Sequence, residues 1–105
     1  MTKVIVLEPT KYVLKEAEIY GELVYISDKH FNIFDIDIML QKINRRLKEI
    51  GYNPLDDSIC LTGGSQEAAL FLGVVASMYS EFIVLIFDYR TSKYRQRMFK
   101  NDNNI

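Results

Sequence analysis

The sequence has 105 residues, of which 49% are hydrophobic and 26% charged, and this composition predicts one globular domain over residues 1–105. No apolar run approaches the ~20 residues of a membrane-spanning helix, and the single cysteine, Cys60, excludes an internal disulfide and a cysteine-cluster zinc site. The net charge of −1 argues against a binder of long duplex DNA, and the absence of a signal-peptide pattern predicts a cytoplasmic protein.

The first third of the chain contains two predicted strands joined by a weakly patterned segment. Val4–Leu7 is apolar and ends before Pro9, and Leu23–Ile26 has a similar character. The segment Tyr12–Tyr20 fits either an edge strand or an irregular connection. The residues from Ser27 to Phe34 are expected to form a loop.

A helix is predicted after Asp35, which is a suitable N-cap residue. Gly51 and Pro54 mark its end. Its apolar residues recur at intervals of three and four and form one stripe, which should cover one face of a sheet; they are Ile36, Met39, Leu40, Ile43, Leu47 and Ile50.

The next part of the chain reads as strand, tight turn, helix and strand. Ser58–Leu61 and Phe82–Phe87 are apolar runs, and Ala68–Met78 between them is helical in character. Two strands joined by a helix usually lie parallel with a right-handed crossover. In that case Gly63-Gly64 and Asp88–Arg90 lie at the carboxyl edge of the sheet, where open α/β sheets bind ligands.

The second helix has almost no polar face, which indicates that it is covered on more than one side. A second copy of the chain would provide this cover, so we expect a homodimer through the helix at 66–79. The alternative is a helix wedged between the sheet and the other helix of the same chain.

The pattern of residues near the end of the chain predicts a strand that forms a hairpin with Phe82–Phe87 through Tyr89–Ser92. Tyr94, Gln96 and Met98 alternate with three other residues up to Phe99, as in a strand, although a short helix is the alternative. The expected fold is therefore α/β, with a mixed sheet of four or five strands, two helices and one strand-helix-strand crossover.

The turn before the second helix is the first candidate binding site. Two glycines allow a close approach of a ligand to the backbone, and the first turn of a helix favours an anion. The turn is not a Walker phosphate-binding loop, because no Lys-Ser/Thr pair follows its glycines, and it lacks the three-glycine pattern of dinucleotide-binding proteins. An ordinary turn is the alternative reading of Thr62, Gly63, Gly64, Ser65 and Gln66.

Asp88 and Arg90 form the second candidate site. An aspartate at a strand end is able to act as a general base, a metal ligand or a hydrogen-bond acceptor, and an arginine beside it is able to hold a phosphate. Lys93 and Arg95 extend a strip of five cations without acids from Arg90 to Lys100. This strip suits a small anionic ligand, or else it is a solvated edge strand whose charge discourages aggregation.

His30 is the only histidine and lies in a predicted loop. Without a second histidine or a nearby cysteine it is a poor metal ligand, and no metal site is predicted. Any histidine-dependent acid–base mechanism would have to use it. The residues indicate no particular cofactor.

The pattern from the turn to the charged corner resembles that of small CRISPR-associated ring nucleases, which degrade cyclic oligoadenylate messengers, and of related small proteins of archaea and their viruses. The similarity covers less than half of the chain. One such family has an aromatic-Asp-Pro-Arg sequence where this chain reads Phe87-Asp88-Tyr89-Arg90. The resemblance implies a groove on a two-fold axis that holds a symmetric oligonucleotide, lined by Gly63, Gly64, Asp88 and Arg90.

That family also places histidines near the end of the preceding helix, where Ser77–Glu81 of this chain has none. Two alternatives therefore stay open. The first is a metal-assisted or metal-independent phosphodiesterase, in which Asp88 promotes attack by a ribose 2′-hydroxyl or holds a metal. The second is binding without cleavage. Two other hypotheses are a non-enzymatic viral or defence-related interaction protein and a simple nucleic-acid-binding module that uses Arg95, Arg97 and Lys100.

Overall fold

A computed structural model describes residues 2–11, 14–62 and 66–100. One five-stranded sheet has the order β2-β1-β3-β4-β5, in which the first four strands are parallel and β5 is antiparallel to β4. The strands are β1 (Lys3–Val6), β2 (Glu22–Tyr25), β3 (Ser58–Leu61), β4 (Glu81–Asp88) and β5 (Lys93–Lys100), and the helices are α1 (Ile36–Glu49) and α2 (Gln66–Met78). The predicted α/β class, with a mixed sheet and two helices, is confirmed.

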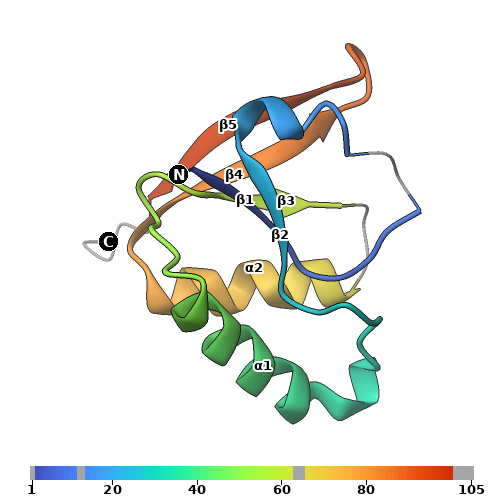
Figure 1. Cartoon of the computed structure of the whole chain (residues 1–105), viewed down its shortest axis with the longest axis vertical. Helices are drawn as coiled ribbons and strands as arrows, with labels where there is room; N and C mark the ends of the chain where they lie inside the picture. Colours follow the sequence, from blue (N-terminus) through green and yellow to red (C-terminus); the bar gives the residue numbers. More distant parts are fainter. Residues whose placement is uncertain (1, 12–13, 63–65, 101–105) are drawn as a thin grey trace.

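Both long helices lie on one side of the sheet (Figure 1). They share one core cluster with residues such as Ile5, Ile59 and Phe82 from the strands. Helix α1 contributes Met39, Ile43 and Leu47, which are spaced by four residues. Ile50, just after the helix, packs partly buried against the same cluster. The predicted apolar stripe was too wide at Ile36 and Leu40, which are 40% and 37% exposed.

The opposite side of the sheet is covered by the connection between β1 and β2. Leu14 and Ala17 pack there against a second cluster of buried strand residues that includes Cys60 and Leu85. A short 3-10 helix, η1 (Glu18–Tyr20), follows, and in Figure 1 it lies across the sheet from α1 and α2. The irregular connection is therefore correct for the described part of 12–20, and the edge strand is wrong.

These connections create a switch point between β1 and β3. The chain leaves the carboxyl end of β1 over one face of the sheet, and it leaves β3 toward α2 on the other face (Figure 1). Strands β1 and β3 are neighbours, so the segments that follow them diverge from adjacent points toward opposite faces of the sheet. Ligands of open α/β sheets bind in the crevice that such a divergence produces.

Helix α2 is better covered by its own chain than its composition predicts. Phe71 and Val75 are buried, and four other apolar side chains of the helix are partly buried against the same core cluster as α1. The exposed positions carry mostly small side chains: Gln66, Ala69, Gly73, Ser77 and Met78. The apolar composition of α2 therefore does not by itself require a second subunit.

The end of the chain forms a strand, β5, and not a short helix. Lys93–Lys100 pairs along its whole length with β4, from Asp88↔Lys93 to Glu81↔Lys100. The hairpin is confirmed, and the short helix is wrong. No helix in the described part of the chain has the length and apolar character to cross a membrane.

At the amino edge of the sheet, a buried carboxylate joins β1 to the loop before β3. Asp57 accepts backbone N–H bonds from Lys3 and Asn53, both at 2.8 Å. The Lys3 ammonium lies 3.4 Å from the same carboxylate, whose side chain is 1% exposed. A charge this deeply buried is stable only while these partners are present.

Replacing Asp57 with alanine should destabilise the protein strongly. The change leaves two N–H groups without their acceptor and removes the counter-charge of Lys3, so the free energy of unfolding should fall by about 3–5 kcal/mol. Urea denaturation measures this loss. The matched control is Asp56→Ala, because Asp56 is exposed and accepts one surface hydrogen bond from Thr2; an equal loss in the control would contradict the assignment.

Candidate functional site

The carboxyl edge of the sheet brings together two of the segments singled out in the sequence. Strands β3 and β4 are parallel, with Leu61 opposite Ile86, so Thr62 and Asp88 follow at the same edge. Gly63, Gly64 and Ser65 lie outside the described residues. Gln66 is the first residue of α2 and is exposed.

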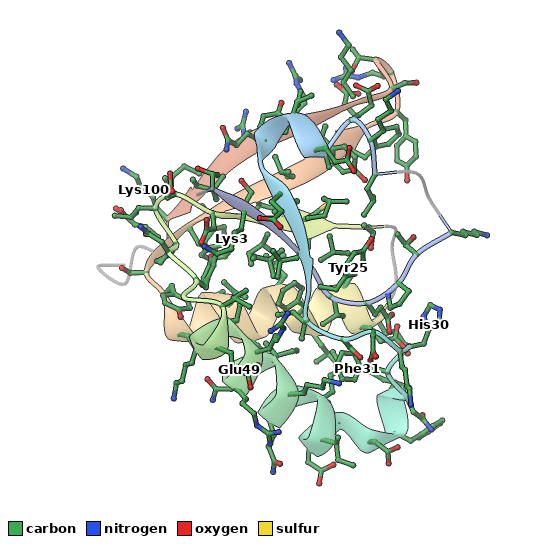
Figure 2. All side chains as sticks on the ribbon, in the orientation of Figure 1. Lys3, Tyr25, His30, Phe31, Glu49 and Lys100 are labelled. Carbon is green, nitrogen blue, oxygen red and sulfur yellow. The ribbon has the colours of Figure 1, made fainter. Side chains whose placement is uncertain are left out.

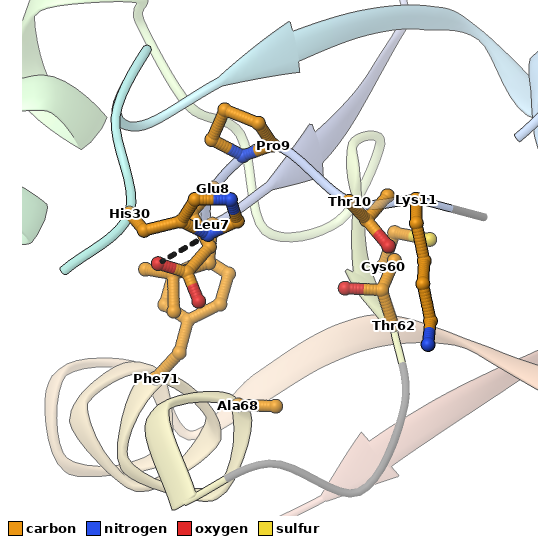
Figure 3. A pocket seen from close by; sticks show the side chains of 10 residues that line it. All are labelled: Leu7, Glu8, Pro9, Thr10, Lys11, His30, Cys60, Thr62, Ala68 and Phe71. Carbon is orange, nitrogen blue, oxygen red and sulfur yellow. Dashed lines mark ion pairs between the residues drawn. The ribbon is translucent and has the colours of Figure 1, made fainter. Parts of the chain in front are cut away.

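A cavity of about 330 Å³, which we call the switch-point cavity, opens between the carboxyl ends of β1 and β3. Its lining comes from the segment that follows β1, from the end of β3 and the residue after it, from the first half of α2 and from the loop after β2 (Figure 3). Ten residues line it: Leu7, Glu8, Pro9, Thr10, Lys11, His30, Cys60, Thr62, Ala68 and Phe71.

The two sides of the switch-point cavity differ in chemistry. Thr10, Lys11 and Thr62 lie together on one side, where they offer two hydroxyl groups and an ammonium group (Figure 3). Glu8, His30 and the ring of Phe71 lie on the other side. The cavity is therefore suited to a ligand with an anionic end and a hydrogen-bonding end.

Glu8 fixes the loop that closes one side of this cavity. Its Oε2 atom accepts the backbone N–H of Phe31 at 2.7 Å and lies 3.7 Å from Nδ1 of His30. The two contacts hold the loop after β2 against the end of β1. The His30 side chain is 75% exposed and lies at the periphery of the molecule (Figure 2), so it borders the cavity entrance.

Cys60 lies at the base of the switch-point cavity and is buried. Burial raises the pKa of the thiol to about 11, and a hydrogen bond with Tyr94 acts weakly in the opposite direction. The thiol is therefore protonated and unreactive at neutral pH, as expected for a small apolar residue in a buried strand.

The second cavity at this edge, which we call the arginine cavity, has a volume of about 390 Å³. It lies over the end of the β4–β5 hairpin. The β4–β5 register places Ile86 opposite Arg95 and Asp88 opposite Lys93, and paired residues share a face of the sheet. The lining residues are Ile86, Phe87, Asp88, Tyr89, Arg90, Arg95 and Arg97.

Asp88 holds two arginines of this cavity. Its Oδ1 accepts the backbone N–H of Arg90 at 3.0 Å and lies 3.4 Å from Arg90 Nε, while its Oδ2 lies 3.6 Å from Nη1 of Arg95. The Asp88 side chain is only 10% exposed, whereas those of Arg90 and Arg95 are 85% and 65% exposed. A shielded carboxylate therefore orients two guanidinium groups that face solvent.

This geometry suits anion binding more directly than base catalysis. Both oxygens of Asp88 are engaged by arginines, while each guanidinium keeps N–H groups that point away from it. Among the described residues, no group of three His, Cys, Asp or Glu side chains could hold a metal ion. The predicted catalytic roles of Asp88 and Arg90 stay predictions.

The structure distributes the predicted ligand-binding residues over several places. Thr62 lines the switch-point cavity, and Arg95 lines the arginine cavity. Lys93 lies on β5 opposite Asp88 and borders a different hollow beside Tyr20. The predicted ligand-binding residues that the structure describes therefore do not line one shared pocket.

Sequence reasoning missed Thr10 and Lys11 as candidate binding residues. They follow the apolar strand β1 after Pro9, just as Arg90 follows the apolar strand β4. That signal was available, but placing it required the knowledge that β1 is the direct neighbour of β3. His30 was considered only as a metal ligand or an acid–base residue, and not as part of a cavity rim.

No protein-family model, curated protein or solved structure matches the chain. The resemblance to CRISPR-associated ring nucleases is therefore carried by the residues from the turn to the charged corner alone, and it stays a hypothesis.

Cys60 should report on the environment of the switch-point cavity. Because the pKa of this thiol is raised to about 11, the thiolate fraction, and with it the alkylation rate, should rise about tenfold per pH unit between pH 8 and 10. Mass spectrometry after timed iodoacetamide treatment measures the rate. The urea-unfolded chain is the control, and its rate should level off near pH 9; the same profile in the folded protein would contradict the raised pKa.

Proposed function

We propose that the protein binds a short or cyclic oligonucleotide at the carboxyl edge of its sheet, with phosphates held by Arg90 and Arg95. The observation that carries this proposal is the arginine pair oriented by Asp88 and exposed to solvent. Planar guanidinium groups bind phosphate oxygens through two parallel hydrogen bonds. Orientation by a shielded carboxylate lowers the conformational entropy lost when the ligand binds.

Other features of the hairpin support a nucleic-acid ligand. Arg97 and Lys93 add positive charge to the same strand, and the ring of Tyr89 is 82% exposed beside them. Cationic grooves with exposed aromatic side chains bind single-stranded nucleic acids, because bases stack on the rings. From Arg90 to Lys100 the chain has five cations and no acids, although its net charge is −1. A short basic strip of this kind favours a short ligand over a long duplex.

The binding test uses cyclic tetraadenylate and a linear oligoadenylate in titration calorimetry. Arg90→Ala and Arg95→Ala should each weaken binding about tenfold, since a charged hydrogen bond contributes roughly 1.5 kcal/mol or more. Arg45→Ala on the exposed side of α1 is the matched control and should change nothing. The proposal fails if the wild-type protein binds neither ligand or if the three variants behave alike.

Binding without turnover is the form of this function that the Asp88 contacts favour. If Asp88 orients the arginines, Asp88→Asn should weaken binding, and chromatography of the incubated ligand, with and without manganese, should show no products. A ring-nuclease-like phosphodiesterase would give the opposite pattern: the wild-type protein would release linear products, and the variant would keep its affinity but lose turnover.

We further propose, as part of the same function, that a cytoplasmic homodimer forms through α2, which would join two carboxyl edges around one ligand. The exposed Ala69, Gly73 and Ser77 lie four residues apart, so they would allow close approach of a second helix. A Cβ atom at Gly73 would meet nothing within 4 Å in the single chain.

Gly73→Leu should therefore leave the monomer folded and prevent dimerisation, because the larger side chain would separate the two helices. Size-exclusion chromatography with light scattering measures the mass, and circular dichroism checks the fold. Lys48→Leu on the exposed part of α1 is the control for an added leucine. A wild-type protein that is monomeric at micromolar concentration would refute the dimer.

A further inference from the structure

We infer that the switch-point cavity is a second binding site, which takes one nucleoside monophosphate with its phosphate at Lys11 and its base on the side of Glu8 and Pro9. The choice of a nucleotide rests on the proposed function, but the location does not. The two cavities share no lining residue. Occupancy of one is therefore measurable without the other.

The position of the cavity is the first support for this inference. The segments that follow β1 and β3 separate toward opposite faces of the sheet, and the cavity occupies the space between them. Its lining combines Phe71 and Leu7 from the helix-side core with Cys60 from the core of the other face. A crevice between the two cores is bordered by packed strands, so its shape does not depend on a ligand.

The phosphate would lie on the side formed by Thr10, Lys11 and Thr62 (Figure 3). An ammonium group attracts a phosphate as a point charge, and two neighbouring hydroxyl groups are able to donate hydrogen bonds to its oxygens. Thr62 is held at the end of β3, and Lys11 follows Pro9 from the end of β1. The two groups therefore approach the ligand from the two strands that form the crevice.

The base would lie on the opposite side of the cavity. Pro9 is half-buried there and provides apolar surface, while Leu7 and Phe71, which are 4% and 1% exposed, form the apolar base of the cavity. Glu8 uses one oxygen to accept the N–H of Phe31, and a carboxylate has about four lone-pair sites. Its remaining acceptor capacity suits an amino group on a base or a ribose hydroxyl, which inorganic phosphate lacks.

The size of the cavity limits the ligand. Sites for small ligands usually measure about 300–1,000 Å³, and this cavity has about 330 Å³. It is therefore at the lower end of that range and suits one nucleotide and not a chain of several. The oligonucleotide itself would need the more open arginine cavity.

The direct test is calorimetry with adenosine monophosphate, ribose 5-phosphate and inorganic phosphate. Ala68→Leu should reduce the affinity for adenosine monophosphate at least tenfold, because the larger side chain fills the cavity without changing any charge. Lys48→Leu is the control for an added leucine, since Lys48 lies on the exposed side of α1, outside both cavities. Lys11→Met should give a similar loss, and because Lys11 is exposed, this variant tests the site even if Ala68→Leu fails to fold.

The alkylation rate of Cys60 tests whether the nucleotide binds in the switch-point cavity. Cys60 is the only cysteine of the chain and lies at the base of the cavity. At about pH 9–10, where a thiolate fraction is present, it should be alkylated at least fivefold more slowly when adenosine monophosphate is bound. Ribose 5-phosphate should protect it less, because it lacks the base. Arg45→Ala on the exposed side of α1 should leave both the affinity and the protection unchanged. The protection itself separates this site from the oligonucleotide site, because Cys60 does not line the arginine cavity.

Three results would overturn the inference. The first is no binding of adenosine monophosphate at millimolar concentration. The second is binding that neither protects Cys60 nor responds to Ala68→Leu and Lys11→Met. The third is equal affinity for ribose 5-phosphate or inorganic phosphate, because the base would then contribute nothing. Each result leaves the test of the arginine cavity unaffected.

Discussion

The whole fold depends on the burial of β1 on both faces. Val4, Ile5 and Val6 are 0% exposed, and a parallel strand with neighbours on both sides needs cover above and below. The two helices cover one face, and the connection from Leu14 onward covers the other. To provide both covers, the chain has to leave β1 and β3 in opposite directions. The crevice at the carboxyl edge is therefore a consequence of how this small domain completes its core.

Two aspartates at opposite edges show how the surroundings decide what a carboxylate does. Asp57 accepts two backbone N–H groups and is 1% exposed, so its charge is used entirely to join β1 to the loop before β3. Asp88 is also shielded, but it contacts exposed arginine side chains. The first carboxylate stabilises the fold, while the second orients groups that remain available to a ligand. The residue type alone does not distinguish these roles, because they are set by the partners.

The local elements of this fold were predictable from the sequence, and the lateral arrangement of its strands was not. Period-two alternation and a turn identified the β4–β5 hairpin, and an apolar helix between two apolar runs identified the β3-α2-β4 crossover. The pairing of β1 with β3 joins residues more than fifty positions apart, and no local pattern encodes it. For this reason Asp88 and Arg90 were found as candidates, whereas Thr10 and Lys11 were not. The exposure of α2 was also misjudged, because composition does not show that its outward positions carry small side chains.

The two cavities differ in how they would contribute to recognition. Exposed guanidinium groups attract any phosphate chain, so the arginine cavity would mainly increase affinity and association rate. The switch-point cavity is bounded by apolar walls and by Glu8, whose Oε2 is fixed by the N–H of Phe31. A carboxylate held in this way accepts further hydrogen bonds from a fixed direction, so a ligand without a donor there would bind less tightly. Discrimination between bases would therefore come from the narrower site between β1 and β3, although the stronger charge lies on the hairpin.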